Sequence, residues 1–103
     1  MMEFPNVEFS KFPEIDEVDS ALLYKTLEHF FKKVSIEEGD TKLHLTVKEY
    51  KKGGLRAQHE VHANLFLGGK QYFSQVTGWQ LLEAVQESLK KVEKEVQKVH
   101  SKK

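Results

Sequence analysis

Hydrophobic residues follow two different periods along the chain, and each period predicts a type of element. From Thr41 to Tyr50 apolar and polar residues alternate, and the alternation returns from Gln58 to Leu67 and from Gln71 to Val76. A period of two is typical of strands with one buried face. Apolar residues instead recur every three or four positions from Val18 to Val34 and from about Trp79 to about His100. This spacing predicts two amphipathic helices.

Residues near the element ends predict a further strand and the starts of the helices. A weaker alternation from Val7 to Phe12, followed by Pro13, indicates a short first strand. Asp16 is placed to cap the first helix, because its carboxylate can accept a hydrogen bond from a backbone amide three residues on. Thr77 or Gly78 is expected to cap the last helix.

Two glycine pairs predict the connections between the last three strands. Gly68-Gly69 is typical of a two-residue hairpin, which would place Leu65 opposite Tyr72 and keep the apolar residues on one face. The same loop length at Gly53-Gly54 would set Val47 opposite a glutamate. That connection is therefore expected to have an odd length of about three or five residues.

The predicted order of elements is strand, helix, three antiparallel strands, helix. A right-handed crossover through the first helix would place both helices on one face of a four-stranded sheet. The fold class is therefore expected to be α+β, a β-α-β-β-β-α two-layer sandwich. Residues 1–103 are expected to form a single domain, since about a hundred residues suffice for one core.

Composition excludes several classes of protein and site. The chain has no cysteine, which rules out disulfides, thiolate zinc sites, iron–sulfur ligation and a cysteine nucleophile. No stretch approaches the length of a membrane span, and no basic region leads into an apolar run near the N-terminus. The expected location is the cytoplasm, with no membrane partner.

The net charge of zero conceals a strong asymmetry. Residues 1–40 contain ten acidic and four basic side chains, whereas residues 41–103 contain six acidic and twelve basic ones. Lysines concentrate toward the C-terminus, after the acidic residues Glu83 and Glu87 of the same predicted helix. Such asymmetry indicates a charged binding face. The alternative is a solvated helix whose last turns carry lysines that offset its dipole.

The run from Glu60 to Lys98 carries a family resemblance. An alternating strand, a Gly-Gly hairpin, a last strand and a helix opening with Leu82, Ala84 and Val85 follow one another there, and the first helix begins Asp19-Ser20-Ala21-Leu22. In these features, and in its lysine-ended last helix, the chain resembles the ribosome hibernation promoting factor and ribosome-associated inhibitor family. The acidic stretch from Phe9 to Asp19 departs from the family's pattern.

The resemblance implies a non-enzymatic, cytoplasmic factor without a cofactor or small-molecule substrate. Such factors bind the small ribosomal subunit, through ribosomal RNA, around the decoding region, and thereby block translation and protect idle ribosomes under stress. The chain resembles the short form of the family, without the C-terminal dimerisation domain, and is expected to be a monomer or a weak dimer.

The expected RNA-binding residues are basic side chains on both helices and on one hairpin. The main group is Lys90, Lys91, Lys94 and Lys98. Lys25, Lys32 and Lys33, beside His29, can extend it if the two helices pack side by side. Lys51, Lys52 and Arg56 flank the Gly53-Gly54 turn, where Arg56 is the only arginine of the chain. Taken without the resemblance, the helical lysines favour a solvated surface, and the turn residues favour plain turn chemistry.

Neither a catalytic site nor a metal site is predicted. The serines stand in no nucleophile-elbow context, and no glycine-rich loop opens a helix after a parallel strand. His59 and His62 fall on opposite faces of one strand, although His44 and His62 share a face and can lie opposite each other in one register.

Four aromatic side chains are candidates for binding. Tyr72 and Trp79 are interpreted as packing residues. Phe66 and Phe73 are expected on the outward face of the sheet. That position leaves a second hypothesis open: a non-catalytic protein-interaction module, able to self-associate, with the same fold but without ribosome binding.

Overall fold

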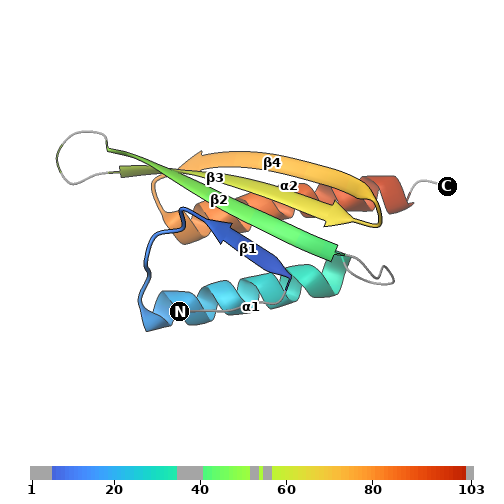
Figure 1. Ribbon diagram of the computed structural model, residues 1–103, viewed down its shortest axis with the longest axis horizontal. Coiled ribbons are helices and arrows are strands. Elements are labelled where there is room, and N and C mark those ends of the chain that lie inside the picture. The colour runs from blue at the N-terminus through green and yellow to red at the C-terminus, as the bar shows by residue number, and fades with distance from the viewer. Residues whose placement is uncertain (1–5, 35–40, 52–53, 55–56, 102–103) are drawn as a thin grey trace.

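The computed structural model describes residues 6–34, 41–51, 54 and 57–101, with side chains described up to residue 98. Its elements follow the predicted order and are labelled in Figure 1. They are β1 (Val7–Ser10), α1 (Glu17–Val34), β2 (Thr41–Lys51), β3 (Ala57–Leu67), β4 (Lys70–Gly78) and α2 (Leu81–Ser101).

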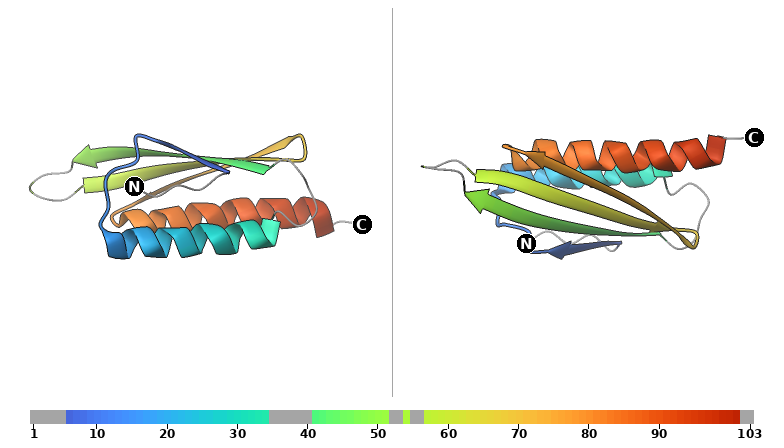
Figure 2. Two further views of the ribbon diagram at one scale, coloured as in Figure 1. Left: turned by 60° about the horizontal axis from the view of Figure 1, so that its bottom comes forward. Right: turned by 90° about the horizontal axis from the view of Figure 1, so that it is seen from above.

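The strands form one sheet in the order β1-β2-β3-β4, with β1 parallel to β2 and the other pairs antiparallel. Both helices cover the same face of this sheet and run side by side, whereas the other face carries no helix (Figure 2). The α+β two-layer sandwich predicted from the sequence is therefore confirmed. No helix among the described residues combines the length and apolar character that crossing a bilayer requires.

The β3–β4 hairpin has the predicted register. Gly68 and Gly69 have φ angles of 57° and 83°, the left-handed values that a primed two-residue turn requires. Leu65 pairs with Tyr72, and both side chains are buried. Between β2 and β3, Lys51 pairs with Ala57, so five residues connect the strands. The expectation of an odd loop length is confirmed, because only this parity keeps the apolar residues of β2 and β3 on one face.

The core lies between the sheet and the helices. It consists of side chains from both helices and three strands: Leu23, Leu27, Phe30, Val34, Leu43, Leu45, Val47, Val61, Ala63, Leu65, Leu67, Tyr72, Val76, Ala84, Val85, Leu89, Val92 and Val96. Two buried serines join β4 to α2. The Ser74 hydroxyl donates to the Ser88 carbonyl oxygen at 2.7 Å, and the Ser88 hydroxyl donates to the Val85 carbonyl oxygen at 2.8 Å. Their polar groups are thus satisfied inside an apolar layer.

The predicted cap of helix α1 is confirmed, but its predicted apolar stripe is only partly buried. The Asp19 amide donates to Asp16 Oδ1 at 2.8 Å. Val18 and Leu22 are 69% and 49% exposed, so the apolar stripe predicted from Val18 to Val34 is wrong at these two positions. Val18 precedes Leu23 by five residues, which turns it about 140° around the helix from the buried side.

Two predicted element ends are also wrong. Strand β1 ends at Ser10 rather than Phe12, since Lys11 has a φ of 56° and leaves the extended conformation. Thr77 and Gly78 belong to β4 and do not cap α2. The first helical hydrogen bond of α2 instead runs from the Ala84 amide to the Gln80 carbonyl oxygen at 3.0 Å.

Candidate nucleic-acid interface

The four lysines of α2 all lie on the exposed side of the helix. Lys90, Lys91, Lys94 and Lys98 are exposed, whereas Val85, Leu89, Val92 and Val96 of the apolar stripe are buried. Because residues three and four apart share a face, these ammonium groups spread over little more than two helical turns. This arrangement provides a row of cations next to solvent.

Helices α1 and α2 are parallel and aligned along their length. Gln86 Nε2 lies 3.4 Å from Thr26 Oγ1, and Lys33 Nζ lies 3.5 Å from Glu93 Oε2. Both contacts join residues whose numbers differ by sixty, so the two helices run in the same direction and stay in register along their length (Figure 2). The predicted side-by-side packing of the helices is confirmed.

The alignment brings basic residues of both helices to one groove. The groove has a volume of about 380 Å³, and Lys25, His29 and Lys33 of α1 line it together with Lys90 of α2. Lys32 is exposed outside this lining. Lys33 is partly neutralised by Glu93, which is also part of the groove. The groove therefore gathers three of the predicted RNA-binding lysines, two from α1 and one from α2.

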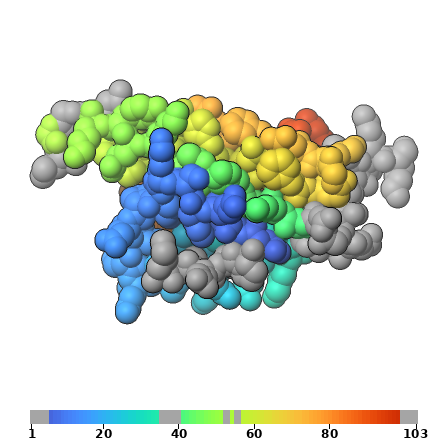
Figure 3. Space-filling view, viewed as in Figure 1, coloured from blue at the N-terminus to red at the C-terminus, as the bar shows by residue number. Residues whose placement is uncertain are grey.

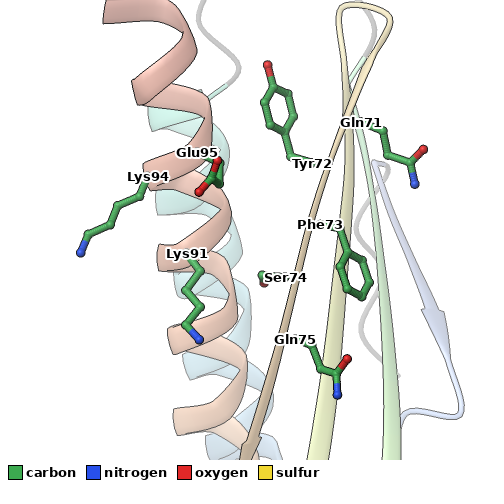
Figure 4. A pocket seen from close by; sticks show the side chains of 8 residues that line it. All are labelled: Gln71, Tyr72, Phe73, Ser74, Gln75, Lys91, Lys94 and Glu95. Carbon is green, nitrogen blue, oxygen red and sulfur yellow. The ribbon is translucent and has the colours of Figure 1, made fainter.

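A second groove separates the other flank of α2 from β4. It is lined by Lys91, Lys94 and Glu95 of α2 and by residues 71–75 of β4, and its volume is about 530 Å³. Figure 4 looks into this groove and shows Lys91 and Lys94 projecting from the helix, with the ammonium end of Lys94 directed away from the strand. Lys90 thus lines the groove on one flank of α2, Lys91 and Lys94 line the groove on the other flank, and Lys98 lines neither.

The same alignment brings the acidic first turns of both helices to one end of the molecule. Glu17 and Asp19 stand in the first turn of α1 and Glu83 in the first turn of α2, whereas Lys32 and Lys33 stand in the last turn of α1. Since the helices run in the same direction, the acidic starts lie at one end and the lysine-rich ends at the other (Figure 1). A chain without net charge can in this way present a cationic surface.

Lys51, at the end of β2, does not join this surface. Lys51 is exposed at the end of β2, and this end lies away from the C-terminal end of α2 (Figure 1). Lys52 and Arg56 lie outside the described residues.

The open face of the sheet carries a polar cluster that sequence reasoning did not predict. This face is turned to the viewer in Figure 3. The Tyr50 hydroxyl donates to Glu60 Oε1 at 2.9 Å, and Gln75 Nε2 donates to Glu60 Oε2. The bond from Tyr50 lowers the pKa of Glu60, against an opposing effect of desolvation, and His62 and Lys48 lower it further. The same bond raises the pKa of Tyr50.

His44 and His62 are not cross-strand partners. His44 pairs with Asn64 and His62 pairs with Thr46, so the register that would set the two histidines opposite each other is not adopted. His44 Nε2 instead lies 2.7 Å from Ser10 Oγ. Within the described part of the chain, no group of three or more potential ligand side chains could hold a metal ion.

The exposed aromatic residues lie partly as predicted. Phe66 and Phe73 are 43% and 52% exposed on the open face, which confirms their outward direction. Phe73 contacts the ring of His62 edge-on, with centroids 5.8 Å apart. Tyr72 is buried, which confirms its interpretation as a packing residue. Trp79 is 46% exposed, so only part of its side chain is covered by packing.

Comparison with solved structures defines the class of fold. No protein-family model matches the sequence, and no curated protein matches it either. The fold is shared with the N-terminal domain of Protein Y from Thermus thermophilus, at a TM-score of 0.58 and 15% identity over 90% of this chain and 94% of that one. It is also shared with a ribosomal subunit interface protein from Coxiella burnetii, at a TM-score of 0.61 and 16% identity over 93% and 98%. These structures match the hibernation promoting factor family that the sequence resembles, and the likeness concerns the fold.

Proposed function

We propose that this protein is a non-enzymatic, ribosome-associated factor of the cytoplasm that binds the small ribosomal subunit near the decoding region and inhibits translation. The observation that carries the proposal is the gathering of lysines from two parallel helices, Lys25 and Lys33 of α1 with Lys90 of α2, in the groove between them. It is supported by the fold shared with a protein named as a ribosomal subunit interface protein.

The physical basis is electrostatic. Lysines arranged along a helix can follow the phosphates of folded RNA without reading bases, and each phosphate contact releases counterions. Lys90, Lys94 and Lys98 supply such a row, and Lys25 and Lys32 widen it on the neighbouring helix. Lys33 contributes less, because Glu93 already neutralises part of its charge.

The test is co-sedimentation with purified small subunits at low and at moderate salt. The wild-type protein is expected to sediment with the subunit at low salt and to dissociate as salt rises. Lys90→Glu combined with Lys94→Glu should abolish the association. The matched control reverses two exposed lysines of the open sheet face, Lys42→Glu with Lys48→Glu, and should leave it largely intact. Absence of association at low salt, or equal loss in both variants, would contradict the proposal.

The second candidate function is a protein-interaction module that self-associates through the open sheet face. The exposed Phe66 and Phe73 favour it, because large apolar side chains on a sheet face are suited to protein contact. Light scattering distinguishes the two functions. A stable dimer that Phe73→Ser dissociates, together with no ribosome association, would establish this second function in place of the first.

A further inference from the structure

Strand β4 forms one edge of the sheet, and its outer side has no partner strand among the described residues. It spans nine residues, Lys70–Gly78, without a proline. The opposite edge strand β1 has only four residues, and the positive φ of Lys11 ends it. A long regular edge offers unpaired backbone groups to an incoming strand, whereas a short interrupted one does not. Strand β4 is therefore the edge at which another extended segment can be added.

The helix beside this edge selects the charge of the incoming segment. Lys91 and Lys94 flank the groove along residues 71–75, with Glu95 as the one acidic side chain of its lining. A strand added to β4 lies about 4.8 Å farther out and sends every second side chain toward the helical layer. Those side chains would run beside the two lysines. Acidic residues at these positions would be attracted, and basic ones repelled.

Self-pairing through the same edge is disfavoured by the same charges. If two copies joined their β4 strands antiparallel into a continuous sheet, both α2 helices would lie on the same face. Lys91 and Lys94 of one copy would then approach those of the other, and like charges brought together in this way are repulsive. Lysines beside a sheet edge are a known protection against edge-to-edge association. The charges beside this edge thus disfavour pairing with a second copy of the chain and favour pairing with an acidic partner.

The remaining side chains of the incoming segment would point to the open face of the sheet, so the residues of β4 on that face determine which side chains suit these positions. Gln71, Phe73 and Gln75 point away from the helices, as Figure 4 shows, and Phe73 is 52% exposed. A cross-strand apolar side chain beside Phe73 would cover part of this ring. We propose that the β4 edge, with Lys91 and Lys94, is a docking site for an extended protein segment in which acidic and apolar residues alternate.

This inference goes beyond the proposed function and needs no ribosome. Because Lys91 and Lys94 also belong to the proposed RNA-binding set, a bound acidic segment would compete with RNA for them. An acidic partner at this edge would then release the factor from RNA or prevent its binding.

The experiment uses the full chain and a fluorescein-labelled peptide of alternating glutamate and valine, about as long as β4. Fluorescence anisotropy should show saturable binding. Lys91→Glu with Lys94→Glu should weaken it by about tenfold or more, since both charges then repel the peptide. The matched control, Lys25→Glu with Lys32→Glu on the other helix, should change it by less than about twofold. Glu95→Gln should strengthen it.

One further peptide separates strand pairing from simple charge attraction. A peptide of the same sequence with an N-methyl group on every residue cannot donate hydrogen bonds from either of its edges, and it should bind at least about tenfold more weakly. Backbone amide shifts should concentrate in residues 71–77. Equal binding of the methylated peptide, or shifts confined to the groove between the helices, would overturn the proposal. So would amide shifts in residues 71–77 that a single-stranded oligouridine produces and the acidic peptide does not.

Discussion

The buried hydroxyl of Ser74 is expected to hold α2 against β4, and its removal has a calculable cost. Its side chain is 8% exposed, and its hydroxyl donates to the Ser88 carbonyl oxygen at 2.7 Å. Ser74→Ala removes one buried hydrogen bond and leaves a volume too small for water. We expect a loss of about 1 kcal/mol in the free energy of unfolding, which for a domain of this size corresponds to a Tm lower by about 4–8 °C.

Urea unfolding followed by circular dichroism measures this cost. The midpoint should fall while the slope m stays constant, because the surface exposed on unfolding hardly changes. Gln71→Ala is the matched control, since it removes a hydrogen bond of similar length, 2.8 Å to Asn64, from the exposed face of the same strand. Its effect should remain within about 0.5 kcal/mol. If Ser74→Ala were as stable as the wild type, the inference that this bond fastens α2 to the sheet would be refuted.

Three further predictions concern the sheet face, the first helix and the core. Tyr50→Phe should raise the pKa of Glu60 toward its ordinary value in an NMR titration. Because that pKa is lowered in the folded state, the stability linked to it is present above the unfolded-state pKa and is lost as pH falls through the folded-state pKa. An unchanged titration of Glu60 would contradict the role given to the hydrogen bond from Tyr50. Asp16→Ala should cost about 1 kcal/mol by removing the cap of α1, with Asp16→Asn restoring most of it in thermal unfolding. Leu27→Ala should cost about 2–5 kcal/mol in urea unfolding, since this side chain is fully buried, and a cost below about 1 kcal/mol would be inconsistent with its place in the core.

Much of the fold follows from local signals in the sequence. The Gly68-Gly69 pair predicts the β3–β4 register, because the primed turns that suit a two-residue hairpin favour glycine. Parity alone restricts the β2–β3 connection to odd lengths, since an even loop would turn apolar side chains toward solvent. The cap at Asp16 is equally local. These features could be predicted because each depends on residues close in the chain.

The features that sequence reasoning missed depend on contacts between distant segments. The polar cluster around Glu60 needs the full β2–β3 register, which brings Tyr50 near it, and the parity rule leaves more than one register open. Leu22 fits the helical period of the core residues, yet it lines the groove between the helices. Such a position depends on where α2 packs, which a helical period by itself does not specify.

The candidate site shows the same division. The lysine row on α2 could be read from its spacing of three and four residues. Its division between two grooves could not, because that depends on where α2 sits between α1 and the edge of the sheet. The common direction of the two helices also places the acidic first turn of α1 far from the C-terminal end of α2 (Figure 1). The net charge of zero is thereby compatible with a cationic surface.

The salt dependence of binding to purified small ribosomal subunits tests the central proposal most directly. The logarithm of the association constant should fall linearly with the logarithm of salt concentration for the wild-type protein. Replacing Lys90, Lys94 and Lys98 by glutamine should make that slope shallower by about one for each phosphate that the variant no longer neutralises. A wild-type protein that does not bind, or a triple variant with an unchanged slope, would contradict the proposed role of this helix face.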